Sequence, residues 1–198
     1  MSWTVVLRGI VLYMLIIGVF APLWFFWFWT WFEYWRRHRG LTNVLVLVTF
    51  LVVGIPMVAA RDTVLAGRVP FPSWVALVGW LLVALGNVFA IVADRQIGVR
   101  VRYFTPFFER QGRIELKTMG AYGVVRHPLY AAAIWIMVGL FLATGYPAML
   151  VAGAVFTLGA SWFTKQEEHR LVTLLDDPSE YDRYRRRVPA LFPFFHRR

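Results

Sequence analysis

The chain has 198 residues, of which 59% are hydrophobic, 18% aromatic and only 16% charged. Soluble domains carry about a quarter charged residues, so this composition excludes an ordinary soluble fold, and the large apolar fraction excludes a disordered chain. Cysteine is absent, which excludes disulfides, thiolate zinc sites and cysteine nucleophiles. The formal net charge is +10. Because the basic residues lie between hydrophobic runs, they indicate anionic lipid headgroups as partners rather than nucleic acid.

Five apolar segments follow one another along the chain and predict membrane-spanning helices, since a helix needs about 20 apolar residues to cross the hydrocarbon core. The first has an expected kink at Pro22 and an aromatic second half that is typical of an interfacial belt, not of a cleavable signal peptide. The last two are short and predict a tight helical hairpin that spans the bilayer fully or in part. The segments are 9–32, 41–60, 73–93, 129–144 and 147–163.

The distribution of basic residues predicts the orientation in the membrane. Eighteen of the 21 Lys and Arg residues lie in the 36–40 loop, the 94–128 connector and the tail from residue 164 onward. By the positive-inside rule, the connector and the C-terminus are expected in the cytoplasm and the N-terminus outside. No Gly-rich loop stands between a strand and a helix, so a soluble Rossmann-type cofactor site is not expected.

Two polar segments border the last hairpin and hold the candidate chemistry. Residues 112–130 bring Arg126 and His127 to the start of the fourth span, and residues 165–168 bring Glu167 and Glu168 to the end of the fifth. The simpler interpretation is an interfacial anchor at one segment and a solvated helix end at the other. If the two spans form a hairpin, however, His127 and Glu167 approach each other.

The motif G-x-Y-x-x-x-R-H-P-x-Y, which spans residues 120–130, resembles the C-terminal core of the isoprenylcysteine carboxyl methyltransferases and the related phospholipid methyltransferases. The resemblance continues through Glu167-Glu168, the Y-x-x-Y-x-x-R-V-P string at 181–189 and Pro-Phe at 193–194, and it covers roughly residues 112–195. The first three spans match the family only in being hydrophobic.

This resemblance implies an all-α, polytopic membrane bundle of about five transmembrane helices. Its cytoplasmic cofactor pocket is expected from the 94–128 connector, the last hairpin and the C-terminal tail. Residues 1–93 would then be three N-terminal spans, and residues 94–198 the catalytic core.

The implied activity is methyl transfer from S-adenosyl-L-methionine to a lipophilic small-molecule or lipidated acceptor. No metal, nucleic acid or protein partner is expected. The candidate catalytic residues are Arg126, His127 and Glu167. The family's cofactor-binding positions fall on Ile114, Glu115, Leu116, Lys117, Tyr122, His127, Pro128, Leu129, Tyr130, Glu167 and Glu168.

The chemistry of these residue types fits a cationic cofactor. A carboxylate such as Glu167 accepts strong hydrogen bonds from an ammonium group or from ribose hydroxyls, and aromatic faces such as Tyr122 and Tyr130 stabilise a methyl-sulfonium. Arg126 or His127 is expected to meet the cofactor's carboxylate. Methyl transfer is an in-line displacement, so positioning and desolvation are expected to supply most of the acceleration.

Two positions depart from the family pattern. Ile114 stands where the family has a histidine, so contacts there are limited to the main chain. Phe163 stands four residues before Glu167, where the prenylcysteine enzymes have an arginine that engages the acceptor's carboxylate. A prenylcysteine carboxylate, a phospholipid amine and another isoprenoid or lipid therefore all remain open as acceptors.

Two other functions remain open on the sequence. Membrane NADPH-dependent reductases of the sterol-reductase type share the RHP-x-Y turn, but they follow it with a glycine and an acidic residue where this chain has Ala131–Ala133. A non-enzymatic membrane scaffold is the other alternative. The arginines between 183 and 187 likewise have two interpretations, as contacts to anionic headgroups or as part of a lid over the cofactor.

Overall fold

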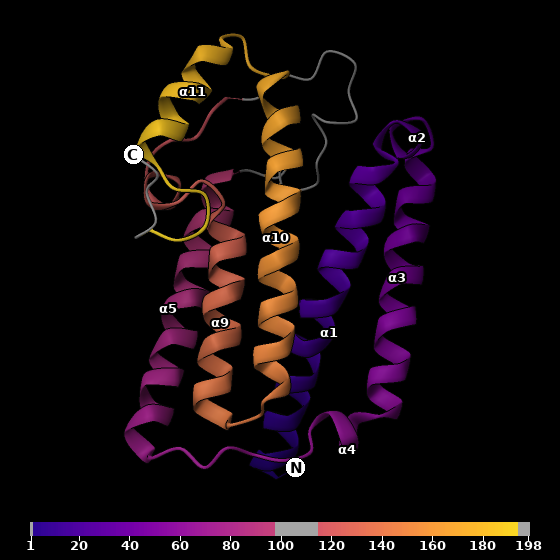
Figure 1. Cartoon of the computed structure of the whole chain (residues 1–198), viewed down its shortest axis with the longest axis vertical. Helices are drawn as coiled ribbons and strands as arrows, with labels where there is room; N and C mark the ends of the chain where they lie inside the picture. Colours follow the sequence, from indigo (N-terminus) through magenta and orange to yellow (C-terminus); the bar gives the residue numbers. More distant parts are fainter. Residues whose placement is uncertain (1, 98–114, 194–198) are drawn as a thin grey trace. The chain divides into compact units, whose positions relative to one another are not determined.

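The computed structural model of the chain describes residues 2–97 and 115–193 (Figure 1). The described residues form helices joined by turns and loops, with no strand among them, so the all-α prediction is confirmed. The helices are α1 (Trp3–Thr30), α2 (Phe32–Arg37), α3 (Arg39–Ala59), α4 (Arg61–Val64), α5 (Ser73–Ile97), α8 (Ala121–Val124), α9 (Pro128–Thr144), α10 (Ala148–Val172) and α11 (Pro178–Arg187).

Four of these helices, α1, α3, α5 and α10, are long and apolar enough to cross a membrane, and α9 is a shorter apolar helix of 17 residues. Large apolar side chains such as Leu47, Val52 and Ile55 on α3 are exposed. Exposed apolar surface on this scale is typical of a lipid-facing protein. The chain is therefore a multi-pass membrane protein, as predicted, and the orientation of its termini stays a prediction.

The helices extend beyond the predicted spans where polar residues continue the helical pattern. α1 begins at Trp3 and includes Arg8, whose Nη2 donates to Asp62 Oδ1 at 2.6 Å. α5 continues through Asp94 to Ile97. α10 continues past Phe163 to Val172, because residues 164–172 contain no glycine or proline and several strong helix formers. This extension carries Glu167 and Glu168 on the last turns of α10.

The chain forms two compact units. The first contains Met1–Ala84 and Ile134–Ala160, and the second contains Leu85–Ala133 and Ser161–Arg198. Helices α5, α9 and α10 each contribute a part to both units, so the units are not consecutive stretches of chain. The predicted functional division between residues 93 and 94 is a separate question and stays a prediction.

In the first unit, α1 and α3 lie side by side and α2 connects them at one end (Figure 1). Phe20 of α1 meets Phe50 of α3 edge to face, with ring centroids 5.5 Å apart. Two glycines allow the backbones of α5 and α9 to come into contact. A Cβ on Gly79 would lie 2.6 Å from the Gly139 carbonyl oxygen, and a Cβ on Gly139 would lie 2.8 Å from the Gly79 carbonyl oxygen. The two backbones are therefore in direct contact, as in other membrane helix pairs with small residues at the crossing.

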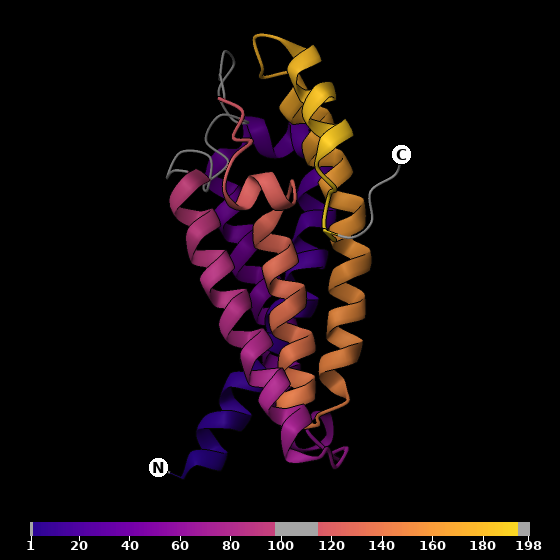
Figure 2. The same ribbon diagram turned by 90° about the vertical axis from the view of Figure 1, so that its left-hand side faces the viewer.

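In the second unit, the short helix α8 immediately precedes α9, and α11 follows α10 (Figure 2). Tyr122 of α8 is buried with Ala93 of α5, and Leu129 packs against them. Tyr181 and Tyr184 of α11 are buried with Val188, against apolar residues that include Leu116 and Leu171. The amphipathic α11 thus buries two tyrosines and leaves its arginines exposed.

The contact between Gly79 and Gly139 generates a stability prediction. We expect Gly79→Ala to lower the free energy of unfolding in detergent by about 1–3 kcal/mol, because the new methyl group meets backbone atoms that have no freedom to move aside. Gly9→Ala is the matched control, since Gly9 is an exposed helical glycine with nothing within 4 Å of an added Cβ. This control should be neutral or stabilise by up to about 1 kcal/mol. Equal effects in the two variants would contradict the close approach.

Candidate active site

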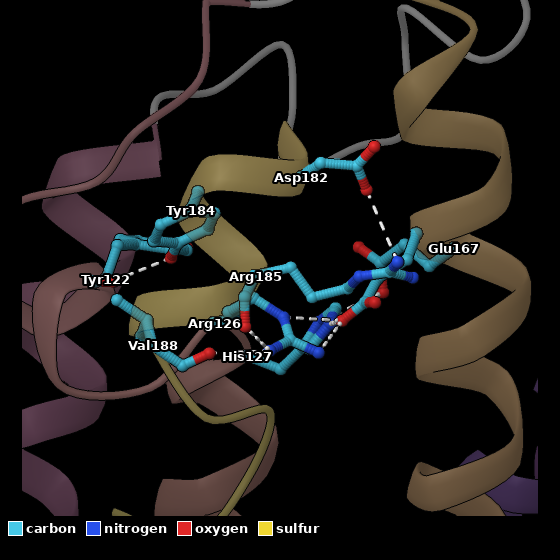
Figure 3. Close-up of polar contacts among 9 residues, drawn as sticks. Tyr122, Arg126, His127, Glu167, Asp182, Tyr184, Arg185 and Val188 are labelled. Carbon is cyan, nitrogen blue, oxygen red and sulfur yellow. Dashed lines mark hydrogen bonds and ion pairs between the residues drawn. The ribbon is translucent and has the colours of Figure 1, made fainter. Parts of the chain in front are cut away.

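The predicted site residues come together in the second unit from three places in the chain. Arg126 and His127 stand in the turn between α8 and α9, Glu167 on α10, and Val188 directly after α11 (Figure 3). Glu168 is next to Glu167 on α10, and residues 189–190 follow Val188. Pro128 is buried and begins α9 at a position where proline is tolerated. His127 and Glu167 do approach each other, as the predicted hairpin requires.

Arg126 connects α10 to the segment after α11. Its Nε and Nη2 both lie 2.9 Å from Glu168 Oε1. Its Nη1 donates to the Val188 carbonyl at 2.5 Å and, at 3.4 Å, to the Arg185 carbonyl. The side chains of Arg126 and Glu168 are only 11% and 12% exposed. The guanidinium is thus committed to a largely buried ion pair and to two main-chain carbonyls.

His127 is the most buried member of the cluster, with a side chain that is 7% exposed. Its Nε2 lies 2.9 Å from Glu168 Oε1, the same oxygen that Arg126 approaches. Its Nδ1 lies 3.7 Å from Glu167 Oε2. The imidazole therefore stands between the two adjacent glutamates.

One carboxylate oxygen of Glu167 accepts a hydrogen bond, and the other is open. The Tyr130 hydroxyl donates to Glu167 Oε2 at 3.1 Å, and the Tyr130 ring lies stacked against that of His127 and edge-on to that of Phe163. Across residues 2–97 and 115–193, Glu167 Oε1 makes no hydrogen bond, and the side chain is 20% exposed. One oxygen of this carboxylate is thus available to a ligand's donor.

The segment after α11 is paired with the RHP turn through the main chain. The amide of Arg126 donates to the Pro189 carbonyl at 2.8 Å, and the amide of His127 donates to the Ala190 carbonyl at 3.0 Å. Sequence reasoning did not anticipate this pairing. The R-V-P string at 187–189 was the available signal, because a proline directly after a helix indicates that the chain leaves it in an extended form.

A buried tyrosine of α11 is hydrogen-bonded to α8, the short helix before Arg126 and His127. The Tyr184 hydroxyl donates to the Tyr122 carbonyl at 2.6 Å (Figure 3). Burial raises the pKa of Tyr122, Tyr181 and Tyr184 well above the ordinary phenol range. A phenol with a raised pKa keeps its proton, so Tyr184 remains a donor throughout the neutral pH range.

The remaining predicted residues do not join this cluster directly. Glu115 and Lys117 pair with each other at 2.7 Å on the surface, and Leu116 packs against the cluster of Tyr181, Tyr184 and Val188. Leu129 packs against Ala121 and Tyr122. Ile114 lies outside the described residues, as does most of the connector that the sequence assigns to the cofactor pocket.

The exposed arginines of α11 mostly find partners on their own helix. Arg183 pairs with Asp177 at 3.3 Å, and Arg185 pairs with Asp182 at 3.3 Å. Arg187 Nε donates to the Arg183 carbonyl at 3.3 Å. The two interpretations of these arginines, contacts to anionic headgroups or a lid over the cofactor, both stay open. The segment after α11 is bonded to the site residues Arg126 and His127.

A second position missed by sequence reasoning is Gln96. Its Oε1 accepts from the amide of Ala121 at 3.0 Å, at the start of α8. Gly120 precedes this contact with φ of +62°, and an added Cβ there would collide with the Gln96 side chain. The backbone conformation favours the glycine of the G-x-Y motif, and a side chain there would displace the Gln96 amide from its contact with Ala121.

Part of the chain is similar in sequence to known proteins. The family described as "Phospholipid methyltransferase" matches residues 74–175. A protein of Crocosphaera subtropica named methanethiol S-methyltransferase is 35% identical over 132 residues, which are 66% of this chain and 49% of that protein. The chain thus spans about half the length of this relative. No solved structure matches the chain.

The bond between Tyr184 and the Tyr122 carbonyl generates a second stability prediction. We expect Tyr184→Phe to destabilise the protein by about 1–3 kcal/mol, since a buried carbonyl loses its donor. The loss should be constant across neutral pH because the raised pKa keeps the phenol protonated. Thermal or denaturant unfolding in detergent measures it, with Tyr13→Phe, an exposed tyrosine on α1, as the matched control. A loss that vanishes within that pH range would contradict a neutral buried donor.

Proposed function

The chain belongs to the phospholipid methyltransferase family, and from this premise we propose that it transfers a methyl group from S-adenosyl-L-methionine to a small, uncharged thiol. The observation that carries the proposal is the cluster of Arg126, His127, Tyr130, Glu167 and Glu168, in which most polar atoms are paired and one carboxylate oxygen is left open. Family membership favours a methyltransferase over an NADPH-dependent reductase and over a scaffold.

The donor set fits the cofactor. S-adenosylmethionine is cationic at its sulfonium and ammonium groups, and it needs anionic oxygens and aromatic faces nearby. Glu167 offers an open carboxylate oxygen, and Tyr130 holds the other oxygen in place. Tyr122 lies close enough to Glu167 for the negative charge of the carboxylate to help raise the pKa of the Tyr122 phenol. We propose that Glu167 binds the ammonium or ribose hydroxyls, and that Tyr122, Leu129 and Tyr130 line the cofactor together with the main chain of 115–117.

Phe163 favours an uncharged acceptor. It is fully buried, and its ring meets that of Tyr130 with centroids 4.8 Å apart, at the position where an arginine would meet a prenylcysteine carboxylate. Arg126 is not a substitute, because its guanidinium already binds Glu168 and two main-chain carbonyls. An anionic acceptor would thus lack a cation among these residues, whereas a small thiol needs none. The name of the Crocosphaera relative supports the same choice.

When bound, S-adenosylmethionine would supply an electrophilic methyl group on its sulfonium sulfur, open to in-line attack by a thiolate. The protein's part is to bind, orient and exclude water. The polar cluster lies at the ends of apolar helices, which suits a water-soluble cofactor and an apolar acceptor that arrives from the lipid. We propose that the connector and C-terminus face the cytoplasm, where the cofactor is made, with membrane lipids as the surrounding partners.

Cofactor binding is the first test of the proposal. Calorimetric titration of the purified, detergent-solubilised protein with S-adenosylhomocysteine should give saturable binding, and a parallel titration with NADPH should give none. Glu167→Gln should weaken the affinity by about 10- to 100-fold, because a charge-assisted hydrogen bond contributes about 1.5–3 kcal/mol. Glu180→Gln, an exposed carboxylate on α11, is the control and should bind normally. Unchanged binding in Glu167→Gln would remove the anchor assignment, and binding of NADPH alone would refute the methyltransferase.

The acceptor is tested by the fate of a labelled methyl group. With isotopically labelled S-adenosylmethionine, we expect label in the thioether product of methanethiol, and little in phosphatidylethanolamine vesicles or in a prenylcysteine. Glu167→Gln should reduce transfer and Glu180→Gln should not. Transfer to the phospholipid or prenylcysteine without transfer to the thiol would refute the proposed acceptor while leaving the cofactor assignment intact.

A further inference from the structure

The His127 imidazole makes only one hydrogen bond within the described parts of the chain. Its Nε2 is bonded to Glu168 Oε1 at 2.9 Å, whereas Nδ1 lies 3.7 Å from Glu167 Oε2, which is too far for a hydrogen bond. The side chain is 7% exposed. Nδ1 therefore has no hydrogen-bond partner among the described residues, and it lies beside the carboxylate of Glu167, one oxygen of which is open.

The position of the imidazole proton follows from the partners of Glu168. Its Oε1 accepts from Nε and Nη2 of Arg126, a guanidinium that always carries its charge. A carboxylate oxygen that faces these donors is ionised and accepts only, so Nε2 of His127 is a donor. A neutral imidazole carries one proton. With that proton on Nε2, the lone pair is on Nδ1.

The groups around the ring keep it in this orientation. From α9, Tyr130 stacks on the imidazole at 5.8 Å between centroids and donates its hydroxyl proton to Glu167 Oε2, the oxygen nearest Nδ1. From α11, the Tyr181 hydroxyl faces Glu168 and Arg126. The main chain is fixed as well, because the His127 amide is bonded to the Ala190 carbonyl. The ring is thus held by Tyr130 on one face and by Glu168 at Nε2, with Nδ1 nearest Glu167.

We propose that Arg126 and Glu168 are positioning residues that hold the His127 proton on Nε2, so that Nδ1 is the atom that takes the proton from the acceptor thiol. This inference rests on the proposed thiol acceptor. A thiol is mostly protonated near neutral pH and reacts as its thiolate, so a base is required. The S–H bond breaks, its proton passes to Nδ1 and its electron pair stays on sulfur. That sulfur then bonds to the methyl carbon as the methyl–sulfonium bond breaks, and the electron pair of the broken bond stays on the departing thioether.

The tautomer can be observed without any cofactor or activity. The chain has four histidines, so a ¹⁵N-histidine-labelled sample in detergent gives a simple NMR spectrum. The His127 signal is identified by its loss in His127→Asn, with His169→Asn, an exposed histidine on α10, as the matched control. We expect the Nε2–H tautomer in the wild-type protein and a mixture of tautomers in Glu168→Ala. An Nδ1–H tautomer, or a doubly protonated ring at neutral pH, would overturn the proposal.

The proton-transfer role is tested with thiols of graded acidity. Glu168→Ala removes the positioning carboxylate and should lower kcat for a weakly acidic alkanethiol by about 10²-fold. For an aromatic thiol, which is already ionised, the same variant should lower kcat much less. Glu168→Gln, which keeps an acceptor oxygen for Nε2, should retain more activity than Glu168→Ala. Equal losses for both classes of thiol would overturn the positioning role, because a purely structural defect does not depend on thiol acidity.

The two proposals fail separately. If the wild-type protein binds S-adenosylhomocysteine but methylates no thiol, the proposed acceptor fails and the proton transfer fails with it. If thiols are methylated but His127 carries its proton on Nδ1, the positioning role fails and the proposed function stands.

Discussion

The arrangement of the site depends on one carboxylate oxygen, Glu168 Oε1. It accepts from the Arg126 guanidinium and from the His127 imidazole, and Arg126 in turn donates to the carbonyls of Arg185 and Val188. Three segments distant in the chain therefore meet at one buried anion. Desolvation makes such a pair a weak source of net stability, but removing one partner leaves an unpaired buried charge that costs about 3–5 kcal/mol. The contact therefore contributes more to a single, specific geometry than to stability.

The adjacent glutamates have different surroundings because successive residues on a helix point in different directions, about 100° apart. Glu168 faces the RHP turn and the segment after α11, where its charge is matched by Arg126. Glu167 faces Tyr130 and keeps an oxygen that no described residue binds. The extension of α10 beyond its apolar part makes this possible, since a helix that ended at Phe163 would not fix the directions of the two carboxylates. Helical continuity through residues 164–172 is thus a condition for the site.

Much of the architecture was readable from the sequence. Length and hydropathy predicted the spans, because in lipid the backbone must satisfy its own hydrogen bonds and only long apolar helices do so. The approach of His127 to Glu167 followed from a hairpin whose two ends lie together. What could not be read were contacts that depend on side-chain direction or on irregular backbone. The Gln96 cap of α8, the pairing of 126–127 with 189–190, and the commitment of Arg126 to main-chain carbonyls leave no periodic signal. Arg126 was a candidate catalytic residue on the sequence, and that role stays a prediction; in the structure its guanidinium binds Glu168 and two main-chain carbonyls.

Phe163 shows how a single position alters the chemistry available to a shared scaffold. An arginine there would bring a charge that recognises a carboxylate; the buried phenylalanine instead packs on Tyr130 and supports the ring whose hydroxyl holds Glu167. Phenylalanine at this position therefore brings no cation to the proposed acceptor site, and it adds apolar packing behind Tyr130. Without a charge to bind, an acceptor has to be selected by size and apolar contact, which discriminate weakly between similar molecules. Reactivity then has to supply part of the selection. In the proposed reaction the basic Nδ1 of His127 has this effect, because it would favour acceptors that have an acidic proton to lose.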